Sequence, residues 1–237
     1  MTSGRPRRPW NVTVAVFGAC FGALCFVVVH MVMADTVDPL SRPVSDYALA
    51  SPGTTLFSLG ILAVTVSCGA LAGSGLGLPD EVRLRASLAA VSVVLILVVV
   101  FRTDTGDVVT SAAGQIHRYA SGVAFLLLTC SGWMVWRRLV TVGDDSAPVL
   151  GGLTLLAFAA LVLTGLNTLE PEFFGRWRGV PQRLLLTVQT VLIVVMASVA
   201  GRTARSGGGH RERGRPVSDE IDPSGTRRPD APVPKCG

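Results

Sequence analysis

Hydrophobic residues form six long blocks along this chain, and most of the charged residues and prolines lie in the short stretches between the blocks and in the two terminal segments. A helix needs about 20 apolar residues to cross the hydrocarbon core of a bilayer. Runs such as Val93–Val100 lack the alternating polarity of a membrane β-strand, so the pattern predicts transmembrane helices. The six predicted spans are Val12–Met33, Ser51–Ala72, Arg85–Phe101, Ile116–Val135, Val149–Thr168 and Leu184–Ala200.

The composition agrees with an all-α membrane protein built as a six-helix bundle. Charged residues make up 16% of the chain, below the roughly 25% of soluble domains. We expect a basic N-terminus over residues 1–11, a transmembrane domain over 12–200 and a disordered tail over 201–237. The tail is rich in glycine, proline and arginine and offers little to bury.

The first apolar block follows Arg5, Arg7 and Arg8, and this arrangement is also found in signal peptides. A cleavage site could be drawn after Ala34. The hydrophobic part of a signal peptide spans about 7–15 residues, however, and this block is longer. We therefore predict that the first helix is retained.

The distribution of basic residues predicts that both termini are cytoplasmic. With the N-terminus inside, the inner segments hold most of the 21 lysines and arginines, although the margin is narrow without the tail. Lys235 is the single lysine, and such a preference for arginine is typical of high-GC coding, as in actinobacteria. We place the chain in the bacterial cytoplasmic membrane, in contact with membrane lipids.

Polar residues that could bind a ligand or transfer a proton collect in the predicted outer loops. His117 is a candidate general acid or base, and Asp104 is a candidate to orient it. Arginine side chains suit bidentate contacts with phosphate oxygens. The candidate ligand-binding residues are Asp46, Tyr47, Arg118, Arg176 and Arg183.

A purely structural interpretation of the same residues stays open. Charges near the hydrocarbon boundary often form ion pairs, here between an acidic and a basic set. The acidic set is Asp46, Asp104 and Glu170, and the basic set is Arg118, Arg176 and Arg183. In this interpretation Tyr47, Tyr119 and Trp177 are residues of the membrane interface.

A metal site is a further alternative, built from His30, His117 and either Asp104 or Asp35. These residue types bind zinc, but their spacing matches no diagnostic metal motif. We predict no metal and no cofactor.

Three short motifs resemble those of a bacterial six-helix membrane family catalogued as domain of unknown function 998. They are Ser45-Asp46-Tyr47, Phe101-Arg102-Thr103-Asp104 and His117. The resemblance covers about residues 12–200; the family more often has proline where Arg102 stands. It implies the six-helix architecture, marks Asp46, Tyr47, Asp104 and His117 for testing, and implies no activity.

The function that we predict is binding or processing of a lipid or cell-envelope precursor at the outer face. A non-catalytic structural or regulatory role is the main alternative. A small-solute transporter is less favoured because the helix centres carry no Asp, Glu, Lys or Arg. No phosphate-binding loop and no nucleic-acid-binding motif occurs. Whether the protein is catalytic, and its oligomeric state, stay open.

Overall fold

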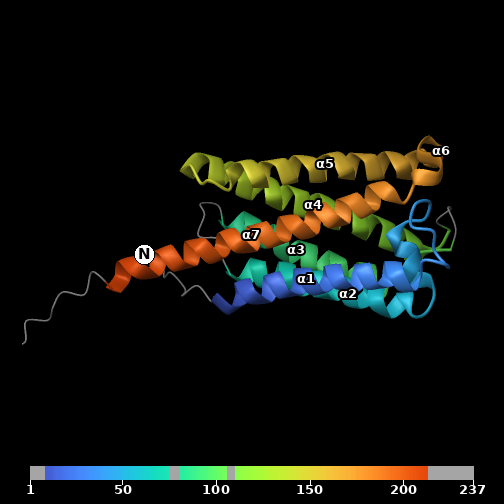
Figure 1. The fold of residues 1–237 in the computed structure, drawn as a ribbon, viewed down its shortest axis with the longest axis horizontal. Helices are drawn as coiled ribbons and strands as arrows, with labels where there is room; N and C mark the ends of the chain where they lie inside the picture. Colours follow the sequence, from blue (N-terminus) through green and yellow to red (C-terminus); the bar gives the residue numbers. More distant parts are fainter. Residues whose placement is uncertain (1–8, 75–80, 106–109, 213–237) are drawn as a thin grey trace, which may run out of the picture. The chain divides into compact units, whose positions relative to one another are not determined.

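The structure is a computed structural model that describes residues 9–74, 81–105 and 110–212. The chain divides into two units after Ala204, and the core and the site described below lie in the first. Its elements are α1 (Pro9–Val32), η1 (Val44–Leu49), α2 (Gly53–Ser74), α3 (Glu81–Val100), α4 (Ala112–Val142), α5 (Ala147–Leu169), α6 (Pro171–Phe174), η2 (Gly175–Trp177) and α7 (Val180–Glu212). Figure 1 shows the long helices side by side.

Six helices of the described chain are long and apolar enough to cross a membrane, which confirms the predicted all-α membrane fold. The sixth helix, α7, continues to Glu212, beyond the predicted end of its span at Ala200. Residues 1–8 of the predicted basic N-terminus and residues 213–237 of the predicted tail lie outside the described residues.

The helices extend past their apolar blocks because capping residues, rather than hydrophobicity, decide where they end. Helix α4 was predicted over Ile116–Val135 but begins after Ser111, whose hydroxyl accepts a hydrogen bond from the Gly114 N–H at 2.9 Å. It ends at Gly143, which adopts a left-handed conformation with φ of 70°. Both are common ways to satisfy the backbone groups of a helix terminus.

Helices α1 and α2 pack at close range through the glycines of α1. A Cβ atom added at Gly18 would lie 2.7 Å from the Ala63 carbonyl oxygen, and one at Gly22 would lie 2.9 Å from a methyl of Val64. Small residues spaced four apart allow such backbone approach between membrane helices. The GxxxG pattern of the first span therefore acts in packing.

Hydroxyl and amide side chains join neighbouring helices inside the bundle, as is common where lipid supplies no hydrophobic drive for association. One such side chain links each pair α1–α2, α2–α3, α3–α4 and α4–α7. The bonds run from Ser67 to the Ala15 carbonyl, from Ser92 to the Thr65 carbonyl, between Ser87 and Ser131, and from Gln189 to the Phe125 carbonyl.

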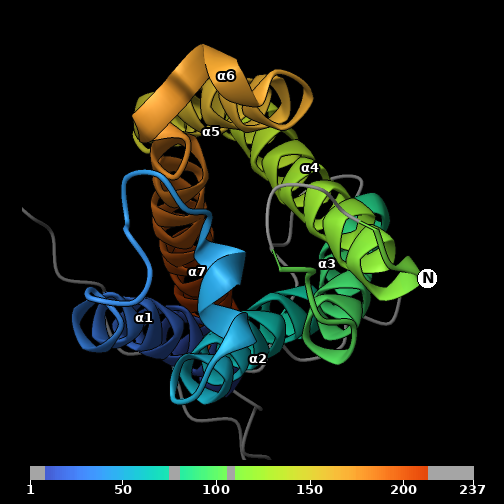
Figure 2. The same cartoon turned by 90° about the vertical axis from the view of Figure 1, so that its right-hand side faces the viewer.

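Helix α7 supplies much of the core. Leu185, Leu192, Ile193 and Met196 are all buried. Half of its most apolar stretch is buried, against 28–39% for the other five spans. A position among the other helices accounts for this burial, and in Figure 2 α7 lies between the α1–α2 pair and the α4–α5 pair.

The loops that follow α1, α3 and α5 meet at one end of the bundle. We call this the η1 end, and it comprises the described residues of segments 33–52, 101–111 and 170–179. Figure 2 is viewed from this end, where the segment holding η1 lies across the middle of the bundle. All of the predicted site residues lie at this end or within about two turns of it.

Candidate functional site

Arg183, near the start of α7, is the centre of a group of residues that we call the Arg183 cluster. Its guanidinium donates hydrogen bonds to His30 Nε2 at 2.7 Å, to the Arg42 carbonyl at 2.6 Å, to the Gly179 carbonyl at 3.0 Å and to the Tyr47 hydroxyl at 3.2 Å. The guanidinium also lies 5.7 Å from the centre of the Tyr47 ring. One side chain thus joins α1, the α1–α2 loop, η1 and α7.

The partners of Arg183 fix the protonation state of His30. The His30 Nδ1–H donates to the Phe26 carbonyl at 2.5 Å, so Nε2 carries the lone pair that accepts from Arg183. This is the neutral tautomer, because a doubly protonated ring has no acceptor. Both ring nitrogens of His30 are therefore used within the protein.

Tyr47 is fully buried in this cluster, so it is not the exposed interface residue that the structural interpretation expected. Its ring contacts that of His30, with centroids 4.9 Å apart. The backbone at Gly179 also packs tightly against this cluster. A Cβ atom added at Gly179 would lie 2.4 Å from both the Arg42 carbonyl oxygen and an Arg183 nitrogen. These contacts indicate a structural brace rather than an open binding site.

Asp104 closes the N-terminus of α4. Its carboxylate accepts hydrogen bonds from the Thr110 N–H at 2.7 Å, the Ser111 N–H at 2.8 Å and the Ser111 hydroxyl at 2.5 Å. The Ser111 hydroxyl, followed by the two N–H groups, holds the pKa of this carboxyl below its usual range. The carboxylate packs against Gly114, where a Cβ would lie 2.5 Å from its oxygen.

His117 is oriented by backbone carbonyls, so the prediction that Asp104 orients it is wrong. The His117 Nδ1–H is shared between the Val98 carbonyl at 3.0 Å and the Phe101 carbonyl at 2.8 Å. The carboxylate of Asp104 has its bonds to the N-terminus of α4 instead, because the loop after α3 turns it toward the free N–H groups there. His117 is 5% exposed.

The predicted ion-pair layer does not form around Arg183 and Asp104, whose partners among the described residues are neutral groups. Asp46 is 8% exposed and pairs with Arg42 at 3.7 Å. The remaining predicted arginines make local contacts. Arg118 donates to the Thr168 carbonyl at 3.4 Å, and the Arg176 guanidinium lies 5.4 Å from the Trp177 ring centre.

The residues of the alternative metal site do not come together in the structure. His30 lies in the Arg183 cluster, whereas Asp104 is bound to the N-terminus of α4. Within the described part of the chain, no three histidine, cysteine or carboxylate side chains are grouped to hold an ion.

A cavity of about 480 Å³ opens at the η1 end, beside α4 and α5, and we call it the large cavity. Its polar wall includes Ser45, Asp46, Thr103, His117, Arg118, Ser121, Asn167, Arg178 and Gln182. The other part of its wall consists of apolar and small residues, which include Gly122, Val123, Phe125, Leu126, Leu161 and Gly165. Volumes of about 300–1,000 Å³ with a few polar groups are typical of ligand sites.

The large cavity is continuous with the outer surface of α4. Tyr119 and Val123, which line it, are 69% and 45% exposed. Both residues belong to a helix that is apolar enough to span a membrane. A lipid molecule beside α4 would therefore have direct access to the cavity.

Three predicted site residues, Asp46, His117 and Arg118, line the large cavity, whereas four do not. Those four are Tyr47, Asp104, Arg176 and Arg183. The cavity residues that sequence reasoning did not propose as part of a site are Ser121, Asn167 and Gln182, whereas Ser45 was noted only as part of a motif and Arg178 only as a possible phosphate contact. One usable signal was the spacing of His117, Ser121 and Phe125, which places them on one face of a helix.

Comparison with known families now adds the decisive observation. A family model described as "Protein of unknown function (DUF998)" matches residues 12–199. The chain belongs to the DUF998 family. The match covers all six membrane-spanning helices and the η1 end. No match is found among curated proteins or among solved structures.

In this DUF998 protein the three motifs have different structural roles. Asp104 holds the start of α4, Tyr47 lies in the Arg183 cluster, and Asp46 and His117 line the large cavity. The motif residues therefore include both structural braces and cavity residues.

Proposed function

We propose that this DUF998 protein binds an anionic phospholipid, or a lipid-linked phosphate precursor, in the large cavity. The observation that carries the proposal is the division of the cavity wall into two parts. Charged and hydrogen-bonding side chains form one part at the η1 end. Apolar and small residues of α4 and α5, including Leu126, Leu161 and Gly165, form the other. A lipid has the same division between headgroup and chain.

The charges of the wall favour an anionic headgroup. Arg118 and Arg178 both line the cavity, and the one carboxylate among the lining residues, Asp46, is paired with Arg42. Among the described residues, Arg118 makes a single hydrogen bond, so most of its donors remain available. Guanidinium groups bind phosphate oxygens through paired N–H donors.

The location of the cavity favours a lipid over a soluble phosphate compound. Its apolar wall lies on two helices that can span a membrane, where acyl chains are the surrounding solvent. Burying an acyl chain along this wall contributes about 0.8 kcal/mol per CH₂ relative to water, but little relative to the bilayer. We therefore expect the headgroup to decide selectivity.

We further propose that the η1 end faces the outside of the cytoplasmic membrane, as the distribution of basic residues predicts. Reporter fusions after Ala50 and Gly175 should then give extracytoplasmic signals, and a fusion after Gly143 a cytoplasmic one. The reverse pattern at all three positions would place the cavity at the cytoplasmic leaflet, leaving the lipid site itself in place.

Two glycines allow the cavity to be filled without disturbing the fold. A Cβ added at Gly122 or Gly165 meets no atom within 4 Å, and both residues line the large cavity. Gly152 on α5 is equally open but does not line the large cavity. Leucine at any of these positions also favours the helix over glycine. Gly152→Leu is therefore a matched control for Gly122→Leu and Gly165→Leu.

The test is native mass spectrometry of the full chain in mild detergent with added phosphatidylglycerol. We expect the wild type and Gly152→Leu to retain one lipid, and Gly122→Leu and Gly165→Leu to retain at least about tenfold less. Inorganic phosphate in excess should not displace the lipid. Equal retention by all four proteins would contradict the proposal, and displacement by inorganic phosphate would point to a phosphate site without a lipid.

A further inference from the structure

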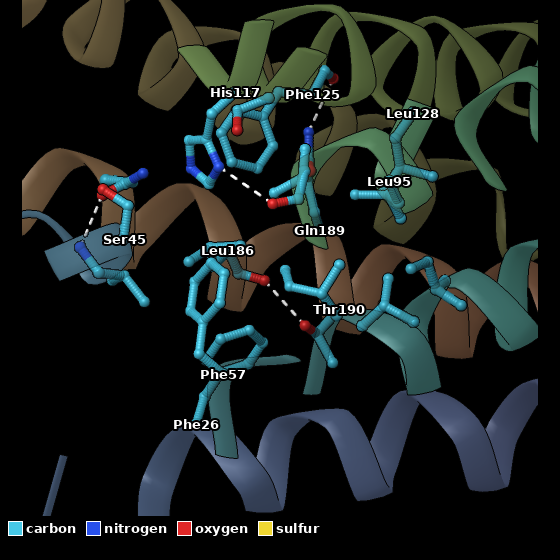
Figure 3. Close-up of a pocket in the computed structure, with 17 residues that line it drawn as sticks. Phe26, Ser45, Phe57, Leu95, His117, Phe125, Leu128, Leu186, Gln189 and Thr190 are labelled. Atoms are coloured by element: carbon cyan, nitrogen blue, oxygen red, sulfur yellow. Dashed lines mark hydrogen bonds between the residues drawn. The ribbon is translucent and has the colours of Figure 1, made fainter. Parts of the chain in front are cut away.

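A polar wall lies between the large cavity and the interior of the bundle. A second cavity of about 50 Å³, the small cavity, lies among α1, α2, α3, α4 and α7. The two cavities share five lining residues, namely Ser45, His117, Ser121, Phe125 and Gln182. We call the four polar ones the shared wall; Figure 3 shows the small cavity with the shared wall among its lining residues.

His117 contributes a hydrogen-bond acceptor to the shared wall. Its Nδ1–H is committed to the Val98 and Phe101 carbonyls, so Nε2 carries a lone pair. Among the described residues Nε2 has no partner, and it is not among the fully buried unpaired atoms. Figure 3 shows the ring pointing into the cavity, with this second nitrogen on the side of Ser45.

The hydroxyls of Ser121 in α4 and of Ser45 in η1 differ from most hydroxyls of the described spans. Thr129, Thr164 and Thr190, for example, each donate to the carbonyl four residues earlier. Within the described chain, neither Ser45 nor Ser121 has a hydrogen-bond partner. Serine in a membrane helix usually bonds back to its own backbone, so the unpaired hydroxyl of Ser121 is unusual, and together with that of Ser45 it lines both cavities.

Gln182 adds an amide to the same wall. Its Oε1 accepts the Val44 N–H at 2.8 Å, which fixes the orientation of the amide. The NH₂ group has no partner among the described residues. The shared wall therefore presents one obligate acceptor, one obligate donor and two hydroxyls that can do either.

None of the free polar atoms of the shared wall is among the fully buried unpaired atoms of the described chain, so the cavities keep these atoms open to water or to a ligand group. All four residues line the small cavity, which holds only a few water-sized groups. A ligand group that both donates and accepts would satisfy the set, whereas a quaternary ammonium or an ester would not. The chemistry that fits is an alcohol with one or more free hydroxyls.

We infer that the shared wall is a subsite for the hydroxyl groups of a polyol headgroup, adjacent to the phosphate site. The inference rests on the proposed function and narrows it: the ligand is a phospholipid whose headgroup carries free hydroxyls. Arg118 takes the phosphate, and His117, Ser121 and their neighbours take the alcohol. Because the wall is uncharged, charge alone does not select the ligand.

The test compares two lipids of equal charge in the same native mass spectrometry titration. Phosphatidylglycerol carries two free hydroxyls on its headgroup, and phosphatidylmethanol carries none. We expect the wild type to bind phosphatidylglycerol about tenfold more tightly, as one or two hydrogen bonds would give. Free glycerol 1-phosphate in excess should leave the bound lipid in place, whereas displacement would mean that the wall serves a soluble polyol phosphate.

The variant Ser45→Ala/Ser121→Ala should bring the two lipids to within about twofold while leaving phosphatidylmethanol affinity unchanged. Ser198→Ala, which removes an exposed hydroxyl bonded to its own helix, is the control and should keep the preference. Unfolding temperatures of both variants should match the wild type, since neither loses a helix-joining bond.

Two outcomes separate this inference from the function on which it rests. Equal binding of both lipids by the wild type, still blocked by Gly122→Leu, would overturn the polyol subsite and leave the phospholipid site standing. A preference for phosphatidylglycerol that survives Ser45→Ala/Ser121→Ala would also overturn it. Absence of binding for either lipid would instead contradict the proposed function.

Discussion

The Arg183 cluster and the large cavity lie at the same end of the bundle, yet they use their polar groups in opposite ways. In the cluster, His30 has both ring nitrogens bonded and Arg183 reaches four acceptors. In the cavity, and counting only partners in the described chain, His117 keeps one ring nitrogen unpaired and Arg118 makes one long bond. Both regions contain one histidine and at least one arginine.

The difference shows that residue type alone does not identify a site. A histidine and an arginine that satisfy each other stabilise the fold and leave little for a ligand. The same residues bonded only to backbone, beside an open volume, keep donors and acceptors for an outside molecule. Motif residues of the DUF998 family occur on both sides of this division: Tyr47 in the cluster, His117 in the cavity.

The largest effect on stability should come from breaking the Arg183 cluster. Arg183→Ala leaves His30 Nε2 and the Tyr47 hydroxyl without their partner, and we expect it to lower the free energy of unfolding by about 2–3 kcal/mol. Thermal unfolding in detergent measures this. Arg176→Ala removes an exposed arginine stacked on Trp177 and should cost less than about 0.5 kcal/mol.

Lipid affinity should remain in folded Arg183→Ala protein at low temperature, since Arg183 does not line the large cavity. Loss of binding together with full stability would reverse the roles that we assign to the two regions.

The converse experiment removes a cavity arginine. Arg118→Ala should weaken phosphatidylglycerol binding about tenfold, through the loss of a charged contact worth about 1.5 kcal/mol or more. It should change the unfolding temperature little, because Arg118 is exposed and has one long bond to the Thr168 carbonyl. Arg118→Lys, which keeps the charge but not the paired donors, should recover part of the affinity. Unchanged affinity in Arg118→Ala would remove the phosphate contact from the proposal.

A smaller loss of stability than that of Arg183→Ala should come from Asp104, which has a structural role at the start of α4. Asp104→Asn should lower the unfolding temperature less than Arg183→Ala and leave lipid binding intact. The lowered pKa of Asp104 gives the pH dependence its sign. The carboxylate stabilises the fold above its unfolded pKa of about 3.9, and this contribution is lost as the pH falls through the lower folded value.

The unfolding temperatures of wild type and Asp104→Asn should therefore differ at neutral pH and converge below about pH 4. A difference that persists unchanged into acid would show that the charge of Asp104 is not what holds the start of α4. A loss of lipid binding in Asp104→Asn would place Asp104 in the site after all.

The six spans could be predicted because each one is a long apolar run. A helix pairs its own backbone groups, which the bilayer core cannot do for them. Their ends could not, because Ser111 and Gly143 act through backbone geometry rather than hydropathy. The GxxxG of α1 was readable as a packing motif, since Gly18 and Gly22 lie on one helix face.

The site could be predicted only as a region. Sequence reasoning brought Asp104 and His117 together because they are close along the chain and chemically complementary. Their true partners, backbone N–H groups and carbonyls, carry no sequence signature. Gln182 was passed over because it reaches the site only through the packing of α7 beside η1.

The central claim is that a phospholipid occupies the large cavity, and photo-crosslinking tests its position directly. The full chain would be placed in nanodiscs containing phosphatidylglycerol with a photoactivatable group on the acyl chain near the headgroup, and the labelled peptides identified by mass spectrometry. We expect the label to concentrate on residues 118–126 of α4 and 161–168 of α5, and to be lost there in Gly122→Leu. Label spread evenly over the exposed faces of α1 and α3, unaffected by Gly122→Leu, would contradict the claim.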